Sequence, residues 1–304
     1  MKGLRIVILM VMGMACLAAG AYGSDVAPGM TALQAVILGI TEGLTEYLPV
    51  SSTGHLYLAA SLMGLGDTAV EKAATDAYVI AIQIGAILAV VWLYPGRISQ
   101  MARGLAGHDP RGLRLAINIG AAFVPAAVIG LAFGDIIKRY LFGVWPITAA
   151  WLVGGLAILV VARRLHSRTV SGGDAADLSL VQALIIGLIQ CIAMWPGVSR
   201  SLVTILGGVL VGLSVPAAVE FSFILGLVTL GSATCYELFK EGPGIMLQFG
   251  WLSPALGIAT AFVSAVFAVK WMVVYLNRHG LEVFGYYRIA LAVGVMVLIL
   301  AGVV

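Results

Sequence analysis

Charged side chains are scarce in this sequence. Lys and Arg number 17 and Asp and Glu number 14, so that charged residues make up 10% of the 304 residues, whereas roughly 25% is usual in a soluble domain. The formal net charge of +3 is too small to indicate nucleic-acid binding. Hydrophobic residues make up 61% and lie in long runs, and a helix of about 20 such residues crosses a bilayer. The composition therefore excludes an ordinary soluble domain.

Cysteine is also rare. Cys16, Cys191 and Cys235 lie far apart inside apolar stretches, without the close spacing that metal-binding cysteines have. We interpret them as small core residues. The cysteines thus indicate neither a metal centre nor a disulfide.

The first residues have the layout of a targeting segment. Lys2 and Arg5 precede an apolar run from Ile6 to Ala19, and small residues follow it. A basic start, a short apolar core and a small-residue end are typical of a secretory signal peptide. We predict that residues 1–23 are a signal peptide, with an extra transmembrane helix as the alternative, and both place Asp25 outside the membrane.

Two segments of the chain have matching sequences. The segment from Gln34 to Ser51 reads QAVILGITEGLTEYLPVS, and the segment from Gln182 to Ser199 reads QALIIGLIQCIAMWPGVS. The glutamine, glycine and serine positions match without a gap, and both segments contain a Pro or Gly break directly before Val-Ser. We therefore predict an internal repeat, with residues 30–162 and 179–304 as two halves of one membrane domain.

Each half continues with three apolar stretches that are long enough to span a bilayer. They are residues 77–94, 115–133, 144–162, 218–238, 252–274 and 286–304. We therefore predict an all-α polytopic membrane protein with six full spans.

The two repeat motifs lead into shorter segments. Thr53–Met63 and Ser201–Leu210 are each about three turns of helix, far short of the ~30 Å of hydrocarbon. Short, interrupted apolar segments at corresponding positions of two halves indicate a buried site. We predict that each motif forms a re-entrant helical hairpin, because irregular backbone inside a membrane must be buried in protein or line a wet cavity.

Three crossings in each half predict that the second half is inverted relative to the first. The charges of the connectors give the orientation, because arginine-rich connectors are usually cytoplasmic. The arginines that lie in or flank the connectors assigned to that side are Arg97, Arg103, Arg111, Arg114, Arg163, Arg164, Arg168, Arg278 and Arg288. The first hairpin would then enter the membrane from outside, which agrees with the signal-peptide prediction.

Two acids lie within the first hairpin. Glu42 and Glu46 are one helical turn apart, so both carboxylates lie on one face. An acid inside a membrane segment costs ~2.5–3.5 kcal/mol. A sequence keeps such a pair when a metal ion, an arginine or a shared proton lies between the two groups. We predict that they bind a divalent metal or take a proton, with a solvated helix end as the alternative.

Three hydroxyls and a histidine follow Pro49, which ends the first helix of the hairpin. One of Ser51, Ser52 and Thr53 is needed to cap the next helix, and a helix N-terminus beside further hydroxyls binds anions. We predict that Ser51 and Thr53 bind phosphate. Ser52 or His55 would be the nucleophile or its base, and a satisfied core histidine is the alternative for His55.

The second hairpin contains Ser199, Arg200, Ser201 and Thr204. A guanidinium in an apolar hairpin needs an anion, and its planar fork suits phosphate or carboxylate. We predict that these four residues bind the substrate phosphates. An ion pair between Arg200 and one of the acids of the first hairpin is a compatible alternative.

Both motifs resemble those of a known family. The chain reads EGLTEYLPVSSTGH from Glu42 to His55 and PGVSRSLVT from Pro196 to Thr204. These segments resemble the E-x-x-x-E and P-G-x-S-R-S-x-x-T segments of the undecaprenyl-diphosphatase, or bacitracin-resistance, family. The segment FVPAAVIGL at Phe123–Leu131 is similar as well. The resemblance extends from about residue 30 to the C-terminus, and the first 29 residues are an addition to the family's pattern.

The resemblance implies hydrolysis of undecaprenyl diphosphate to undecaprenyl phosphate and inorganic phosphate, which recycles the carrier lipid of cell-wall synthesis and confers bacitracin resistance. It implies a multi-pass protein of the bacterial inner membrane, with the active site facing the periplasm, and a divalent cation, Mg²⁺ or Ca²⁺. It leaves open a homodimer and the choice between a covalent intermediate and direct attack by water. The alternative is a transporter that flips a lipid phosphate, because inverted repeats with broken helices are a transporter architecture.

Overall fold

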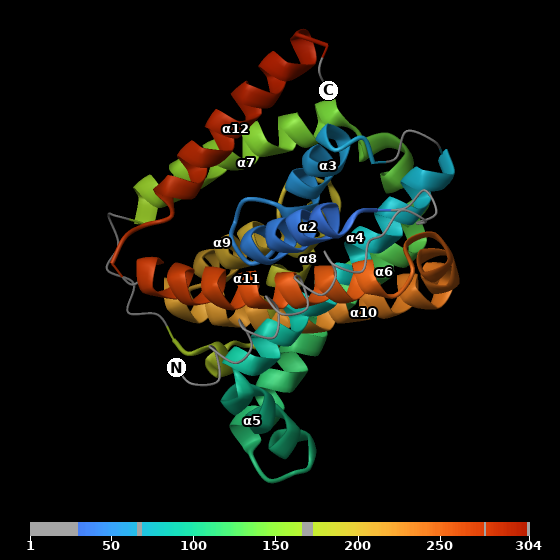
Figure 1. Ribbon diagram of the computed structural model, residues 1–304. Helices are drawn as coiled ribbons and strands as arrows, with labels where there is room; N and C mark the ends of the chain where they lie inside the picture. The colour runs from blue at the N-terminus through green and yellow to red at the C-terminus, as the bar shows by residue number, and fades with distance from the viewer. Residues whose placement is uncertain (1–29, 66–68, 166–172, 277, 303–304) are drawn as a thin grey trace.

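A computed structural model describes residues 30–65, 69–165, 173–276 and 278–302 (Figure 1). The predicted signal peptide, residues 1–23, lies outside these ranges. The regular elements within them are helices, and six helices are long and apolar enough to cross a membrane. They are α4 (Ala69–Leu93), α6 (Pro110–Leu141), α7 (Val144–Leu165), α10 (Val215–Phe249), α11 (Leu252–Leu276) and α12 (Glu282–Leu300). The prediction of an all-α protein with six apolar spans is confirmed.

Shorter helices form the two repeat motifs. The first helix pair is α2 (Ala32–Thr45) with α3 (Ser52–Leu62), and the second helix pair is α8 (Leu180–Gln190) with α9 (Arg200–Leu210). The remaining short elements are α5 (Pro95–Leu105), η1 (Ala175–Asp177) and η2 (Cys191–Met194). None of these helices reaches the length of a bilayer span.

The two helix pairs begin with the same cap. Thr31 and Ser179 each form a capping box with the glutamine three residues later, which satisfies backbone N–H groups that a helix start leaves free. The same glutamines reach across each pair: Gln34 donates to the Met63 carbonyl at 3.3 Å, and Gln182 donates to the Val211 carbonyl at 2.8 Å. Each pair is therefore fastened where its first helix begins and its second ends.

The break inside each pair has the same backbone conformation. Ser51 and Ser199 have φ values of 75° and 79°, in the left-handed region, which is costly for residues other than glycine. Each serine hydroxyl accepts a hydrogen bond from a backbone N–H of the following helix, that of Gly54 at 3.5 Å and that of Leu202 at 3.3 Å. The capping contacts offset part of this cost, and strained positions of this kind are common at functional sites.

Each helix pair packs on a long helix from the opposite half of the sequence. α2 lies on α11, and α8 lies on α6 (Figure 1), so each pair packs on a long helix of the other half of the chain. A Cβ atom at Gly39 would lie 2.0 Å from the Thr260 hydroxyl, and one at Gly187 would lie 2.5 Å from the Ala122 carbonyl oxygen. Glycine thus permits the close approach at both contacts. α4 pairs with α10 and α7 with α12, so the two halves share one core.

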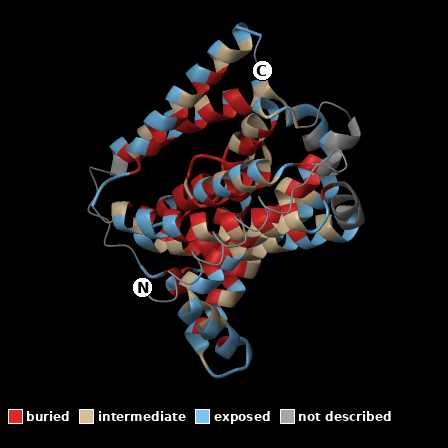
Figure 2. Ribbon diagram, in the orientation of Figure 1, coloured by how far each residue is buried: buried red, intermediate tan, exposed pale blue. Residues whose placement is uncertain are grey.

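Figure 2 shows where that core lies. Buried residues are concentrated where α2, α8 and α9 meet α10 and α11, whereas the outer faces of α6, α7 and α12 are exposed. These outer faces carry large apolar side chains, among them Leu131, Val153 and Leu300. Apolar side chains on the outside of apolar helices are what a lipid environment requires.

An ion-pair network joins two of the connectors that were predicted to be cytoplasmic. Arg97, at the start of α5, contacts Asp174 at 2.7 Å and Glu220 at 2.6 Å. Partial burial opposes ionisation of Asp174, but the Ala176 N–H and the Arg97 guanidinium hold the pKa of Asp174 below its usual value. The connector between α4 and α6 therefore lies beside the one between α7 and α8.

The prediction that Arg288 flanks a connector was wrong. The sequence interpretation placed it at the edge of the last apolar stretch, residues 286–304. α12 instead begins at Glu282, and Arg288 is fully buried within it. Its guanidinium donates to the carbonyls of Pro49 at 3.3 Å, Ala150 at 2.9 Å and Gly197 at 2.8 Å. Carbonyls at both helix breaks thus bind a buried cation whose position the sequence interpretation did not predict.

Candidate active site

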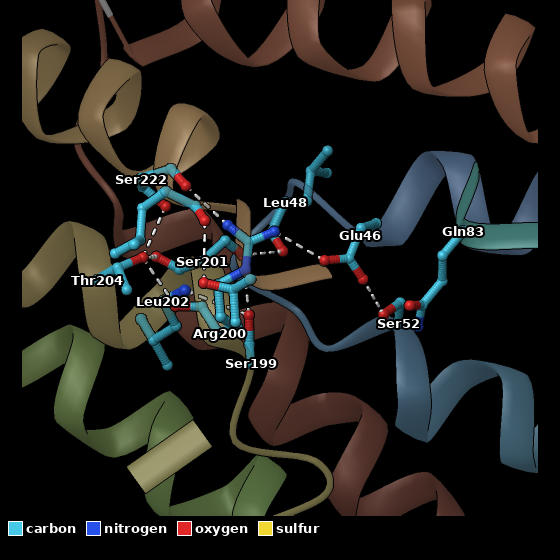
Figure 3. A network of polar contacts seen from close by, with 12 residues as sticks. Glu46, Leu48, Ser52, Gln83, Ser199, Arg200, Ser201, Leu202, Thr204 and Ser222 are labelled. Carbon is cyan, nitrogen blue, oxygen red and sulfur yellow. Dashed lines mark hydrogen bonds and ion pairs between the residues drawn. The ribbon is translucent and has the colours of Figure 1, made fainter. Parts of the chain in front are cut away.

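An ion pair joins the two helix pairs at their breaks (Figure 3). Arg200, the first residue of α9, donates from Nη2 to Oε1 of Glu46 at 2.8 Å and from Nη1 to the Ser222 carbonyl of α10 at 2.8 Å. Its guanidinium also lies 5.6 Å from the centre of the Tyr47 ring. Both charged side chains are buried, with 9% and 6% exposure. Because a guanidinium has five donors and Nε has no hydrogen-bond partner among the described residues, Arg200 retains capacity for another anion.

Ser52 completes this contact from the first turn of α3. Its hydroxyl donates to Oε2 of Glu46 at 2.5 Å, so the Glu46 carboxylate accepts from Arg200 with one oxygen and from Ser52 with the other. A hydroxyl within hydrogen-bond reach of a carboxylate is the arrangement of a nucleophile and its base. The prediction that Arg200 pairs with an acid of the first motif is therefore confirmed for Glu46.

A cavity with a volume of about 760 Å³ opens at this contact. Its polar end is formed by Glu46, Ser51, Ser52, Thr53, Ser199 and Arg200. Its wall runs between α6 and α10 and is mostly apolar, with Phe123, Ala126, Gly130, Leu131 and Leu230. Charged side chains, Asp135 and Lys240 among them, lie at the other end of the cavity. The shape suits a ligand with an anionic head and an apolar chain.

Two of the predicted phosphate ligands have other partners. The Ser201 hydroxyl donates to the Leu48 carbonyl at 3.0 Å, and the Thr204 hydroxyl lies 2.6 Å from that of Ser222. Both side chains are fully buried, and neither is among the residues that line the cavity within the described part of the chain. In this structure Ser201 and Thr204 hold α9 against the first helix pair and α10.

His55 faces away from this cavity toward α7 and α12. Its Nδ1 lies 2.6 Å from the Ser51 carbonyl oxygen and its Nε2 lies 2.8 Å from the Tyr287 hydroxyl. The ring stacks on Tyr287 and makes an edge contact with Trp151. Among the described residues that line the cavity, His55 is not included. Its contacts hold the strained Ser51 backbone and place the ring against Trp151 of α7 and Tyr287 of α12.

Comparison with known proteins identifies the family. The family profile described as "Bacitracin resistance protein BacA" matches residues 35–294. The chain belongs to the bacitracin resistance protein family. Among its relatives in this family, "Undecaprenyl-diphosphatase 2" of Rhodospirillum rubrum is 44% identical over 272 residues, which cover 90% of this chain and 96% of the relative. "Undecaprenyl-diphosphatase" of Sorangium cellulosum is 45% identical over 84% of this chain and 83% of the relative.

Glu42 is the acid that the structure leaves without partners. It lies one turn before Glu46 on α2 and is fully buried, and neither of its carboxylate oxygens has a hydrogen-bond partner among the described residues. A buried, unpaired carboxylate is costly. No group of three or more His, Cys, Asp or Glu side chains within the described ranges could hold a metal ion.

The sequence interpretation did not identify three polar residues of the site. Ser222 binds Arg200 through its carbonyl, Arg288 binds both breaks, and Gln83 on α4 lines the cavity. Two of the three carried a detectable signal, since Gln83 and Arg288 are polar side chains within the spans of a bacitracin resistance protein, and such residues are functional candidates by default. The role of a backbone carbonyl has no sequence signal.

Proposed function

We propose that this protein hydrolyses undecaprenyl diphosphate to undecaprenyl phosphate and inorganic phosphate. The observation that carries the proposal is the Ser52–Glu46–Arg200 contact at the polar end of a cavity with an apolar wall. Family membership and the names of the relatives support the same substrate. Recycling of the carrier lipid for cell-wall synthesis, and bacitracin resistance, follow from that activity.

The cavity accommodates the two parts of this substrate separately. The diphosphate would lie at the polar end, where Arg200 and the hydroxyls of Ser51, Thr53 and Ser199 donate to phosphate oxygens. The first isoprene units would lie along the apolar wall between α6 and α10. Arg200 would keep its contact with Glu46 and offer its remaining donors to the phosphate, since a planar guanidinium can serve two anions at once.

The reaction needs a group that takes a proton as the attacking oxygen forms its bond to phosphorus. In the step that we propose, the Ser52 oxygen attacks the terminal phosphorus while its proton moves to Glu46. The bond from that phosphorus to the bridging oxygen breaks, Glu46 passes its proton to that oxygen, and undecaprenyl phosphate leaves. Water then attacks the phosphoserine and gives a proton to Glu46. As the bond from phosphorus to the Ser52 oxygen breaks, Glu46 returns this proton to that oxygen, which releases inorganic phosphate and restores Ser52. Arg200 stabilises the charge that develops on the phosphoryl oxygens.

A divalent cation, Mg²⁺ or Ca²⁺, would fit beside Glu42. Mg²⁺ is commonly bound by one or two carboxylates together with substrate phosphates and water, and Glu42 has two buried oxygens without hydrogen-bond partners. We propose that Glu42 and Glu46 hold the cation together with the diphosphate. When bound, it would neutralise part of the phosphate charge. Glu42 would thereby gain the partner that the protein alone does not supply.

We further propose that the two helix pairs are re-entrant hairpins of an inverted repeat, in a multi-pass protein of the inner membrane. The matched caps and the matched strained serines support a repeat. The contact between Arg97 and Asp174 supports a common, cytoplasmic side for two arginine-bearing connectors. The cavity ends near Asp135 and Lys240, far along α6 from Arg111, which supports a site that faces the periplasm.

Two experiments test these proposals. Purified protein in detergent should release inorganic phosphate from a long-chain polyprenyl diphosphate, and a chelator should abolish the release. A protein that only flips lipid would release no phosphate, so that result would favour the transporter instead. For topology, in a variant without native cysteines, Trp251→Cys should be labelled from the periplasm and His108→Cys only after permeabilisation. Labelling of both from one side would contradict the proposed orientation.

A further inference from the structure

Gln83 is a polar residue within an apolar span. It lies on α4, in the segment Thr75–Leu93, which has the composition of a membrane span. Its side chain lines the same cavity as Glu46 and Ser52, and Figure 3 shows its amide end directed toward Ser52. α4 belongs to neither helix pair, so the motifs of the sequence do not include this residue.

A neighbouring threonine fixes the orientation of this amide. The hydroxyl of Thr234, on α10, donates to Oε1 of Gln83 at 3.4 Å. Thr234 is buried, with 2% exposure, so its hydroxyl has no access to bulk water. In the structure the amide oxygen of Gln83 is thus the end that faces Thr234. The NH₂ group of Gln83 is therefore the end that remains for the cavity, and it has no hydrogen-bond partner among the described residues.

A second glutamine shows the contrast. Gln190, at the end of α8, also accepts a hydrogen bond from a threonine of α10, Thr229, at 3.3 Å. The NH₂ group of Gln190, however, donates to the Ala122 carbonyl at 3.4 Å. The NH₂ group of Gln190 therefore has one donor engaged by the protein, whereas that of Gln83 has none engaged by the described residues. Gln190 thus helps to hold α8 on α6, whereas the NH₂ group of Gln83 is available to a ligand in the cavity.

We infer that Gln83 is a further catalytic residue, whose NH₂ group donates to the oxygens of the terminal phosphoryl group during transfer; this inference rests on the proposed function. The phosphorus attacked by Ser52 must lie beside the Ser52 oxygen, and the amide of Gln83 is directed toward the same side chain (Figure 3). Arg200, on α9, contacts Glu46, whereas Gln83 would supply its donors from α4.

The neutrality of this side chain suits its neighbours. A lysine at this position would pair with Glu46 and compete with the proton transfer, and a glutamate would repel the phosphate. An amide donates hydrogen bonds without disturbing the charge balance between Glu46 and Arg200. Preorganised donors directed at developing charge contribute more to the transition state than to substrate binding, so Gln83 should affect kcat more than KM.

The test is the kinetics of phosphate release from a polyprenyl diphosphate by purified variants. Loss of one such donor typically lowers kcat about 10²–10³-fold, and we expect a fall in that range for Gln83→Ala and a larger one for Gln83→Glu, with KM changed less than threefold. Thr234→Val, which frees the amide to turn, should lower kcat about tenfold. The comparison variant, Thr229→Val, removes the equivalent hydroxyl beside Gln190, which lines the same cavity, and should lower kcat less than Thr234→Val does.

The outcomes separate this inference from the proposed function. If the wild-type protein releases no phosphate, the proposed function fails. If the wild type is active and Gln83→Ala keeps its kcat within threefold, or changes only KM, the role of Gln83 in transfer is refuted. Thermal unfolding in detergent checks that each variant is folded. Should Gln83→Ala fail to fold, Gln83→Glu, which keeps the size of the side chain, and the two threonine variants decide the matter.

Discussion

Replacement of Glu46 by glutamine separates the chemistry of the site from its architecture. Glu46 accepts from Arg200 at 2.8 Å with one oxygen and from Ser52 at 2.5 Å with the other. Glutamine has nearly the same size, and its oxygen can still accept from Arg200 while its NH₂ group faces the Ser52 oxygen. The contacts therefore remain, but the negative charge and the ability to take a proton are lost.

The magnitudes follow from these two contacts. Hydrogen bonds to a charged group contribute about 1.5–3 kcal/mol and neutral ones about 0.5–1.5 kcal/mol. We therefore expect Glu46→Gln to lower the free energy of unfolding by about 1–3 kcal/mol. Removal of the whole side chain in Glu46→Ala would leave Arg200 unpaired and cost about 3–5 kcal/mol. Loss of a general base typically lowers kcat ~10²–10⁴-fold, so the folded glutamine variant should be nearly inactive.

The assay is phosphate release from a polyprenyl diphosphate, with thermal unfolding measured on the same sample. Glu42→Gln is the matched control, because Glu42 has no hydrogen-bond partner to lose among the described residues. We expect Glu42→Gln to have low activity that excess Mg²⁺ or Ca²⁺ partly restores, whereas metal should not restore Glu46→Gln. Activity of Glu46→Gln within tenfold of the wild type, or full recovery with metal, would refute its role as the base.

Four further predictions follow from the structure. Ser52→Ala should keep no more than about a thousandth of kcat; a residual activity of a tenth would show that water attacks directly. Gly130→Leu should fill the cavity wall and raise KM for long-chain substrates at least tenfold, which competition with a short-chain diphosphate would reveal. Arg288→Met removes the hydrogen bonds of the guanidinium to three carbonyls and should lower the free energy of unfolding by at least about 3 kcal/mol. The pKa of Asp174 is lowered in the folded protein, so its ionised form stabilises the fold relative to Asp174→Asn. This difference in the free energy of unfolding should be fully present above the ordinary pKa of about 3.9 and should disappear as the pH falls through the lower folded value. Thermal unfolding of both proteins as a function of pH measures it.

Hydrophobic patterning and the motifs predicted much of this protein. Apolar runs marked the six long helices, and the pairing of Arg200 with an acid followed from the cost of burying either charge alone. Which acid it pairs with did not follow, because Glu42 and Glu46 lie on the same helical face. The direction of His55 was equally out of reach, since Tyr287, its partner, lies 232 positions away in the sequence. Contacts of this kind depend on how α3 meets α12, which no local pattern records.

The packing of α2 on α11, a helix from the other half of the chain, also determines when the site can form during synthesis. Glu42 and Glu46 leave the ribosome early, whereas Arg200 and α11 follow only after most of the chain has been made. Until then the acids would enter hydrocarbon without a cation, at a cost of several kcal/mol, so the first helix pair must wait near the membrane surface. A chain that stops before α11 would contain every residue of both motifs but would lack the long helix on which α2 packs. The site is complete only after the last helix, α12, has followed, because its Arg288 binds the carbonyls at both breaks.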